Sequence, residues 1–128
     1  MTGYHINIEK KSIENSYFRE VLFTGPHSQL VVMALKPGED IGLETHPDTD
    51  QFIRVESGEG KAILDEQEYE LQDGSALVIP AGAKHNVMNT SSTEPLKLYT
   101  VYTPSEHPDG TIHKTKAEAE EYEREYHK

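Results

Sequence analysis

The sequence predicts an all-β fold, an antiparallel sandwich or barrel that ends in one short helix. Most of the 128 residues fall into short β-prone segments separated at regular intervals by Gly, Pro, Asp and Asn turn signals. Only the C-terminal end breaks that rhythm and shows helical spacing instead. A chain of this length predicts one domain, with enough core to fold without disulfides.

The predicted strands follow one another in short steps. We expect them at residues 18–24, 28–36, 51–56, 61–64, 69–71, 76–79, 85–89 and 96–102. Gly25-Pro26 ends the first strand, Pro37-Gly38 ends the second, and Asp73-Gly74 turns the chain into the strand at 76–79. Strands this short, joined by turns this regular, favour an antiparallel arrangement.

Alternation along the strands predicts which residues face the core. If Gln51 points inward, then Ile53 and Val55 do as well, and Phe52 and Arg54 point outward. Two other predicted strands, at 28–36 and 96–102, are apolar on both faces and therefore need cover on both sides. The barrel core provides one cover. The N-terminal segment or a second copy of the chain provides the other, and we predict a homodimer.

The C-terminal segment predicts a helix. Thr115 is followed three residues later by Glu118, which is the capping-box pattern. Good helix formers occupy residues 116–126, and Ala119, Tyr122 and Tyr126 share one side at helical spacing. We therefore expect a barrel at residues 1–114 and a helix packed on it at residues 115–128.

Composition excludes several classes of function. The chain carries 23 acidic and 12 basic residues, a net charge of −11, which disfavours contact with nucleic acid or an anionic membrane surface. It has no cysteine, so disulfides, thiolate nucleophiles and cysteine-ligated metals are excluded. The polar N-terminus lacks an apolar run of signal-peptide length, and no segment is long enough to span a membrane. We expect a cytoplasmic protein.

Two segments supply four candidate metal ligands. Glu44 and His46 are two residues apart, so on a strand both side chains face the same side. Gln51 follows five residues after His46, across a loop that can return the chain to a neighbouring strand. His85 comes from a distant segment, after a turn at Pro80-Ala81-Gly82. Local and remote ligands in this combination are usual in enclosed catalytic metal sites, so we predict one site formed by these four residues.

These segments resemble the two motifs of the cupin superfamily. The first motif, at residues 38–58, is G-x5-H-x-H-x(3,4)-E-x6-G, with Gly38, His46 and Gly58 in register. The second motif, at residues 74–89, is G-x5-P-x-G-x2-H-x3-N, and all its fixed positions are filled: Gly74, Pro80, Gly82, His85 and Asn89. The resemblance to a small single-domain cupin implies a double-stranded β-helix, or jelly-roll, barrel with a metal inside one mouth.

Two positions depart from the family pattern. Glu44 stands in place of the first histidine, and Gln51 stands in place of the glutamate. The formal charge of the site is unchanged, but one imidazole is replaced by an amide oxygen. This harder donor set favours one divalent transition metal of the Mn, Fe(II) or Zn type over copper and nickel. The same donor types, in another order, occur in cupin-like phosphomannose isomerases.

The resemblance implies three candidate functions. We predict a metalloenzyme that acts on a small oxygen-rich organic substrate, with dioxygenase-like or related chemistry. The alternatives are a sugar or sugar-phosphate isomerase and a non-catalytic cupin that binds a small ligand. His107 and His113, which flank the turn after the last strand, could reach the barrel mouth, but we expect them in a surface loop.

Overall fold

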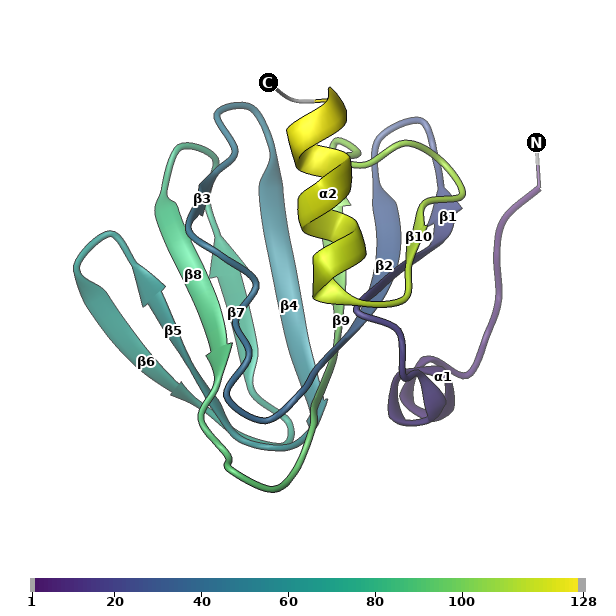
Figure 1. The fold of residues 1–128 in the computed structure, drawn as a ribbon. Coiled ribbons are helices and arrows are strands. Elements are labelled where there is room, and N and C mark those ends of the chain that lie inside the picture. Colours follow the sequence, from purple (N-terminus) through teal and green to yellow (C-terminus); the bar gives the residue numbers. More distant parts are fainter. Residues whose placement is uncertain (1, 127–128) are drawn as a thin grey trace.

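The computed structural model describes residues 2–126 and shows two antiparallel sheets that face each other (Figure 1). The larger sheet has six strands, in the order β10 (Ile112–His113), β1 (Arg19–Thr24), β2 (Gln29–Leu35), β9 (Leu96–Thr103), β4 (Asp50–Ser57) and β7 (Ala76–Ile79). The smaller sheet has four strands, in the order β3 (Glu44–Thr45), β8 (Lys84–Asn89), β5 (Gly60–Leu64) and β6 (Gln67–Leu71). The predicted all-β class is confirmed.

Each predicted strand is present, with ends within two residues of those expected. The structure adds three elements that were not predicted: the two-residue strands β3 and β10, and the helix α1 (Ile8–Glu14). Asn7 caps α1 by accepting a hydrogen bond from the backbone N–H of Lys10. The only buried residue of α1 is Ser12, so the helix has no apolar stripe that a sequence pattern could detect.

The core lies between the two sheets. Gln51, Ile53 and Val55 of β4 are buried, whereas Phe52 and Arg54 are partly exposed, as the alternation predicted. The outer face of the larger sheet is covered in part by α1, which packs on β2, β4 and β9. The N-terminal segment therefore supplies cover on this side, and the homodimer stays a prediction.

Helix α2 (Lys116–Tyr126) lies across the gap between β3 of the smaller sheet and β10 of the larger one (Figure 1). The backbone N–H of Glu118 donates to Oγ1 of Thr115 at 3.1 Å, which confirms the predicted cap. Ala119 is buried, and the ring of Tyr122 lies 5.4 Å from that of His113. The side chain of Tyr126 lies outside the described residues. The division into a barrel at 1–114 and a helix at 115–128 stays a proposal.

Two residues of the sequence motifs have structural roles. Gly58 has a φ of +109°, and a Cβ at this position would lie 2.6 Å from the carbonyl oxygen of Pro95. Asn89 donates to the carbonyl oxygens of Leu35 and Glu94 and accepts from the N–H of Ser91, so it links three segments. Gly58 follows β4 and Asn89 ends β8, so both lie at the opposite strand ends from Gln51 and His85.

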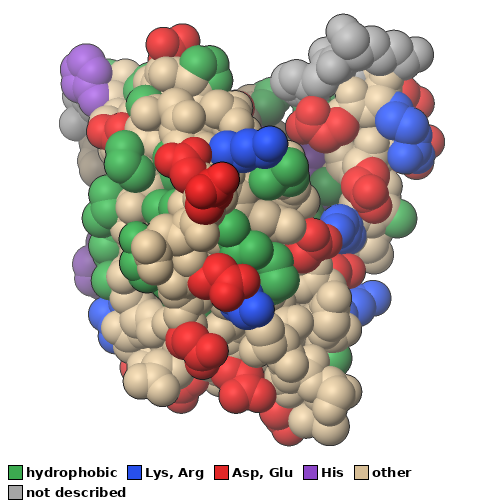
Figure 2. Space-filling model, turned by 90° about the vertical axis from the view of Figure 1, so that its left-hand side faces the viewer, with side chains coloured by type: hydrophobic (Ala, Val, Ile, Leu, Met, Phe, Trp, Pro, Cys, Tyr) green, Lys and Arg blue, Asp and Glu red, His purple; other side chains and the backbone are tan. Residues whose placement is uncertain are grey.

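The surface is strongly acidic. Acidic side chains are spread over the face that Figure 2 shows, with hydrophobic side chains between them. The segment from Gly38 to Asp73 contributes 12 acidic residues and only two basic ones. Within residues 2–126, no helix has both the length and the apolar character needed to cross a membrane.

Candidate metal centre

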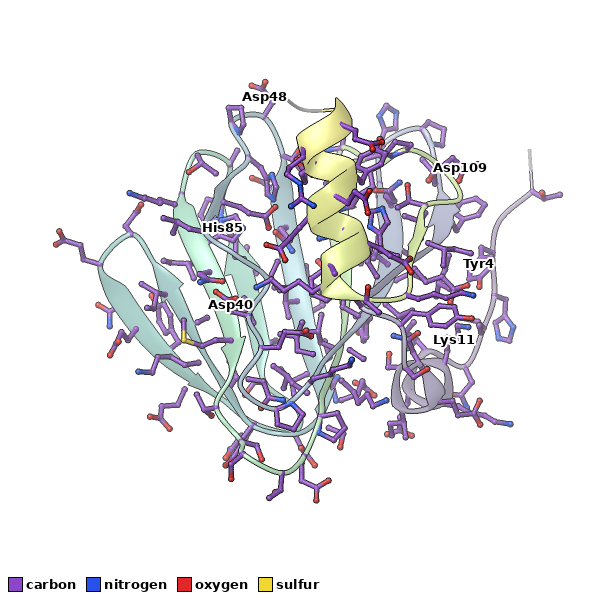
Figure 3. The ribbon with its side chains drawn as sticks, viewed as in Figure 1. Tyr4, Lys11, Asp40, Asp48, His85 and Asp109 are labelled. Atoms are coloured by element: carbon purple, nitrogen blue, oxygen red, sulfur yellow. The ribbon has the colours of Figure 1, made fainter. Side chains whose placement is uncertain are left out.

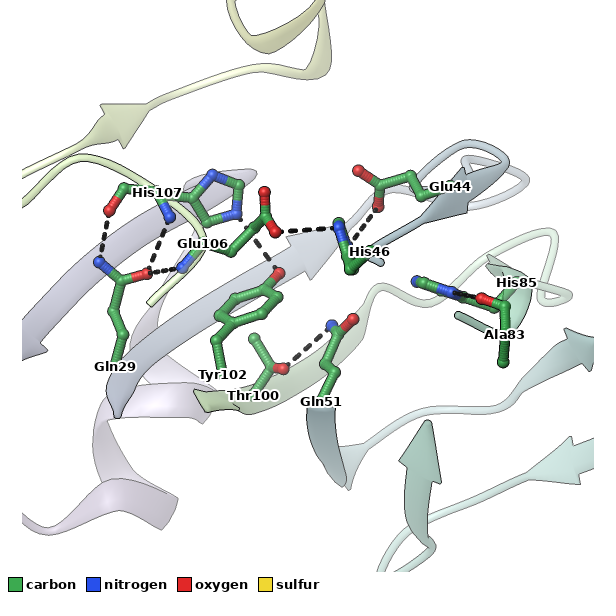
Figure 4. Close-up of polar contacts among 10 residues, drawn as sticks. All are labelled: Gln29, Glu44, His46, Gln51, Ala83, His85, Thr100, Tyr102, Glu106 and His107. Carbon is green, nitrogen blue, oxygen red and sulfur yellow. Dashed lines mark hydrogen bonds and ion pairs between the residues drawn. The ribbon is translucent and has the colours of Figure 1, made fainter. Parts of the chain in front are cut away.

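The four predicted ligands come together at one mouth of the barrel (Figure 4). Glu44 lies on β3 and pairs in register with His85 on β8, while His46 follows β3 directly. His85 lies on β8 of the smaller sheet (Figure 3) and is buried. One donor atom each from Glu44, His46 and His85 lie within 4.8 Å of one another. Gln51 approaches from β4 on the opposite sheet.

The two histidines are held in the same tautomer. Nδ1 of His85 lies 2.9 Å from the carbonyl oxygen of Ala83, and Nδ1 of His46 lies 3.1 Å from Oε1 of Glu106. A carbonyl or carboxylate oxygen only accepts, so each Nδ1 must carry the proton. The Nε2 atom of each neutral ring then presents a lone pair, which is the form that binds a metal.

Gln51 is oriented in the same way. Its Nε2 donates to Oγ1 of Thr100 at 3.1 Å, which turns the amide oxygen Oε1 away from that hydroxyl. Figure 4 shows this amide on the side of β4 that faces His46. Gln51 is only 3% exposed, so Oε1 depends on a partner inside the protein.

The donor set fits a metal ion by a test that is independent of the sequence motif. Nε2 of His46, Nε2 of His85 and Oε1 of Gln51 are buried and have no hydrogen-bond partner within the described part of the chain. Each buried polar atom left in this state costs about 1–3 kcal/mol. Oε1 of Glu44 lies 3.9 Å from Nε2 of His46, beyond hydrogen-bond range. A cation between these atoms would satisfy all three lone pairs.

Burial and neighbouring charges shift the pKa values of Glu44 and His46. Burial raises the pKa of Glu44, although His46, Arg19 and His85 act to lower it. For His46, burial acts to lower the pKa, but the hydrogen bond to Glu106 and the carboxylates of Glu44 and Glu106 outweigh it and raise the pKa. Both side chains therefore hold protons more readily in the metal-free protein than they would in solution.

Glu106 is a site residue that sequence reasoning did not find. It follows β9 in the segment that leads to β10, and Gln29 of β2 holds this segment in place. Oε1 of Gln29 accepts from the N–H groups of Glu106 and His107, and its Nε2 donates to the carbonyl oxygen of His107 at 2.7 Å. Gln29 is 1% exposed. In the sequence, the only indication of this role was that an acidic residue stands next to His107.

Of the two histidines of this segment, His107 lies in a loop as expected and His113 does not. His113 lies on β10 and is 8% exposed, so its expected place in a surface loop was wrong. Pairing of β10 with β1 buries it. His107 is partly buried, and its Nε2 lies 3.4 Å from the hydroxyl of Tyr102. Tyr102 in turn packs edge-on to His46, with ring centres 6.0 Å apart.

An antiparallel double-sheet barrel with a Glu/His/His cluster at its mouth defines the structural class. A family model of the cupin domain matches residues 31–102. The YrkC protein of Bacillus subtilis (strain 168) is 48% identical over 120 residues, which are 89% of this chain and 64% of that protein. The L612 protein of Acanthamoeba polyphaga mimivirus is 46% identical over 112 residues, 85% of this chain and 70% of that protein.

The chain belongs to the cupin family, as its motifs predicted. It spans less than two thirds of the length of the B. subtilis relative. The crystal structure of BH2720 from Bacillus halodurans has a TM-score of 0.91 and 45% identity to this chain. That similarity covers 94% of this chain and 95% of the other.

Proposed function

We propose that this protein is a metal-dependent cupin enzyme that acts on a small oxygen-rich molecule. In this proposal one divalent transition metal is held by Glu44, His46, Gln51 and His85. The observation that carries it is the convergence of three buried lone pairs, which have no partner among residues 2–126, next to one carboxylate. Each of those side chains is turned inward by a hydrogen bond from its other polar atom.

The donor types narrow the choice of metal. Two imidazole nitrogens and two oxygens, one of them a neutral amide, form a harder set than three imidazoles and a carboxylate. Such a set favours Mn, Fe(II) or Zn over copper and nickel. When bound, an ion of this kind polarises a carbonyl or hydroxyl oxygen as a Lewis acid, and Mn or Fe can also support chemistry with dioxygen. Four protein donors leave coordination positions for substrate.

The surrounding residues contribute positioning and a proton. Glu106 holds His46 in the tautomer that exposes Nε2. Burial raises the pKa of Tyr102, so its hydroxyl keeps its proton and can donate a hydrogen bond beside His46. A protonated hydroxyl at this place suits a substrate oxygen that carries partial negative charge.

An isomerase of sugars or sugar phosphates is the second candidate. The feature that favours it is the donor composition, because an inward amide oxygen accompanies two histidines and one glutamate. A non-catalytic cupin that binds a small ligand is the third. Three assays distinguish the candidates. Oxygen uptake with enediols or dicarbonyls supports oxygen-dependent cleavage, and interconversion of aldose and ketose phosphates supports isomerisation. Binding of such a compound without turnover supports the non-catalytic cupin.

Metal analysis tests the proposal. Protein purified without added metal, then offered Mn, Fe(II) and Zn, should bind close to one equivalent of one of them. His46→Ala and His85→Ala should each lose that metal while the circular dichroism spectrum is kept, and His27→Ala, at an exposed histidine, should retain it. Less than about a tenth of an equivalent in the unmodified protein would refute a tight metal site here.

A further inference from the structure

Arg19 is a buried cation without an ionic partner. It lies on β1, is 5% exposed, and has no carboxylate within 4.0 Å among residues 2–126. Its Nε is buried without any hydrogen-bond partner in the same part of the chain. Its Nη1 makes one long contact, 3.5 Å from Nδ1 of His113, and the guanidinium lies over the ring of Phe18.

This state is costly for an arginine. A buried guanidinium without a counter-charge loses its hydration without compensation, at a cost of several kcal/mol. The chain carries 23 acidic residues, so partners are abundant elsewhere. Arg54 is much more exposed than Arg19, and it nevertheless has Glu56 at 3.3 Å. Because no residue among 2–126 supplies Arg19 with a counter-charge, its isolation points to a partner from outside this part of the chain.

The place of Arg19 identifies where that partner would bind. Arg19 and Glu44 line the same small cavity, of about 60 Å³, which lies between β1, the segment before β3, and Ala119 of α2. The cavity thus joins the unpaired cation to one of the proposed metal ligands.

The size and chemistry of this cavity favour a carboxylate. The cavity, of about 60 Å³, is small, and a carboxylate group is compact enough to enter it beside Arg19. A guanidinium offers two parallel N–H groups, which match the two oxygens of a carboxylate. Glu120 and Glu123 of α2 also line the cavity, but both are exposed, so solvent screens their repulsion.

We propose that Arg19 binds the carboxylate of the substrate, which makes the substrate a small hydroxy acid or keto acid. The carboxylate pairs with the guanidinium, and the hydroxyl or carbonyl oxygen of the same molecule lies on the side of Glu44, the proposed metal ligand that lines this cavity. This inference rests on the proposed metal-dependent function. His113 assists by accepting from Nη1, since burial and then the charge of Arg19 lower its pKa and keep it neutral.

Side-chain NMR of the unmodified, Zn-loaded protein tests the proposal directly. The chain has three arginines, so the Nε–H signals of Arg54 and Arg124 serve as internal references. Titration with glycolate should shift the Arg19 signal in a saturable manner and leave the references unchanged, and neutral ethylene glycol should have no effect. An Arg19 signal that does not respond to glycolate up to tens of millimolar, or that responds equally to both compounds, would overturn the proposal.

Variants provide the second arm. Arg19→Met should weaken glycolate binding by about tenfold to a hundredfold, because one charged hydrogen-bonded pair is lost. The glycolate affinity of Arg19→Lys should lie between those of the unmodified protein and of Arg19→Met. Arg54→Met should bind glycolate as tightly as the unmodified protein does. Chelator competition measures metal affinity in parallel. An unmodified protein that takes no metal refutes the proposed function. If Arg19→Met binds metal normally and binds glycolate as tightly as the unmodified protein, only the role of Arg19 is refuted. If Arg19→Met does not fold, the NMR titration of the unmodified protein decides.

Discussion

Three lone pairs meet at the mouth of this barrel because each of their side chains has its other polar atom fixed within the chain. Ala83 holds His85, Thr100 holds Gln51, and Glu106 holds His46. An isolated histidine or glutamine on a strand would turn either polar atom toward water. Fixed in this way, the side chains have lost that freedom in advance, so a metal would bind without ordering them.

Gln51 is the donor for which the structure makes the most specific prediction. Gln51→Leu keeps a buried side chain of similar size and removes the amide oxygen, so we expect metal affinity to fall about tenfold or more while the protein stays folded. Competition with a fluorescent chelator measures the change. Gln67→Leu, at an exposed glutamine, is the matched control. Unchanged affinity in Gln51→Leu would show that three residues hold the metal without Gln51.

Glu106 should matter even though it is not a proposed ligand. Glu106→Gln keeps a hydrogen-bond acceptor for His46 but removes the charge, so we expect metal affinity to fall about tenfold. Calorimetric titration with Zn measures this, and Glu70→Gln, at an exposed glutamate on β6, is the control. Equal affinities in Glu106→Gln and the control would mean that the contact with His46 does not support the site.

Metal affinity should decrease as pH falls. Burial raises the pKa of Glu44, and the carboxylates around His46 raise its pKa against the opposing effect of burial. A metal must displace the protons of both groups, so binding weakens as pH falls through these raised values. We expect at least about a tenfold loss of Zn affinity from pH 8 to pH 6.

Glu106→Gln provides the control for this pH dependence. Without the carboxylate at position 106, the pKa of His46 is lower, so the loss of affinity should begin at a lower pH. Affinities that do not change between pH 6 and pH 8 in the unmodified protein would contradict the proton competition.

The sequence predicted the four candidate ligands but not the residues around them. Strand alternation grouped Glu44 with His46, and the short loop after His46 was expected to return the chain so that Gln51 joins them. Glu106 and Arg19 depend on the path of the chain after β9 and on the pairing of β1 with β10. No local pattern encodes such tertiary proximity, so these residues became visible only in the structure.

At the level of elements, the same distinction holds. Predicted strands such as 96–102 were recognisable from their own alternation or apolar run. The capping pattern of Thr115 and Glu118 predicted the start of α2. The strands β3 and β10 are two residues long, too short for any period, and exist because β8 and β1 provide their hydrogen bonds. Strand β3 carries Glu44 to the mouth, and β10 places His113 beside Arg19, 3.5 Å from its Nη1.

Helix α2 is attached to the barrel by an ion pair that should depend on pH. Lys116, in its first turn, pairs with Asp40, which Figure 3 places beside that end of the helix. A hydrogen bond from Asn86 and then Lys116 lower the pKa of Asp40. The contribution of Asp40 to stability is therefore complete above the ordinary aspartate pKa of about 3.9, and is lost as pH falls through the lower folded-state value.

Asp40→Asn tests this attachment in the metal-free protein. The melting temperature of the variant should be lower than that of the unmodified chain at pH 6, and the difference should begin to shrink as pH falls below about 3.9. Asp109→Asn, at an exposed aspartate, should show no such dependence. A difference as large at pH 3 as at pH 6, or no difference at pH 6, would contradict the role of Asp40.

For the whole molecule, the homodimer remains to be tested. Helix α1 covers part of the outer face of the larger sheet, but large apolar side chains elsewhere stay exposed, including Val78 at 64% and Leu43 at 63%. We expect sedimentation equilibrium at high micromolar concentration to give twice the chain mass of 14.4 kDa. A mass equal to that of a single chain would contradict the homodimer and would show that α1 and the core cover the larger sheet without a second copy.

The central claim is that one metal ion sits among Glu44, His46, Gln51 and His85. Anomalous diffraction from a crystal of the Zn-loaded protein, collected on both sides of the zinc edge, tests it most directly. We predict one strong peak per chain, about 2.0–2.1 Å from Nε2 of His46 and of His85. No peak at the barrel mouth, or a peak bound only by other residues, would contradict the claim.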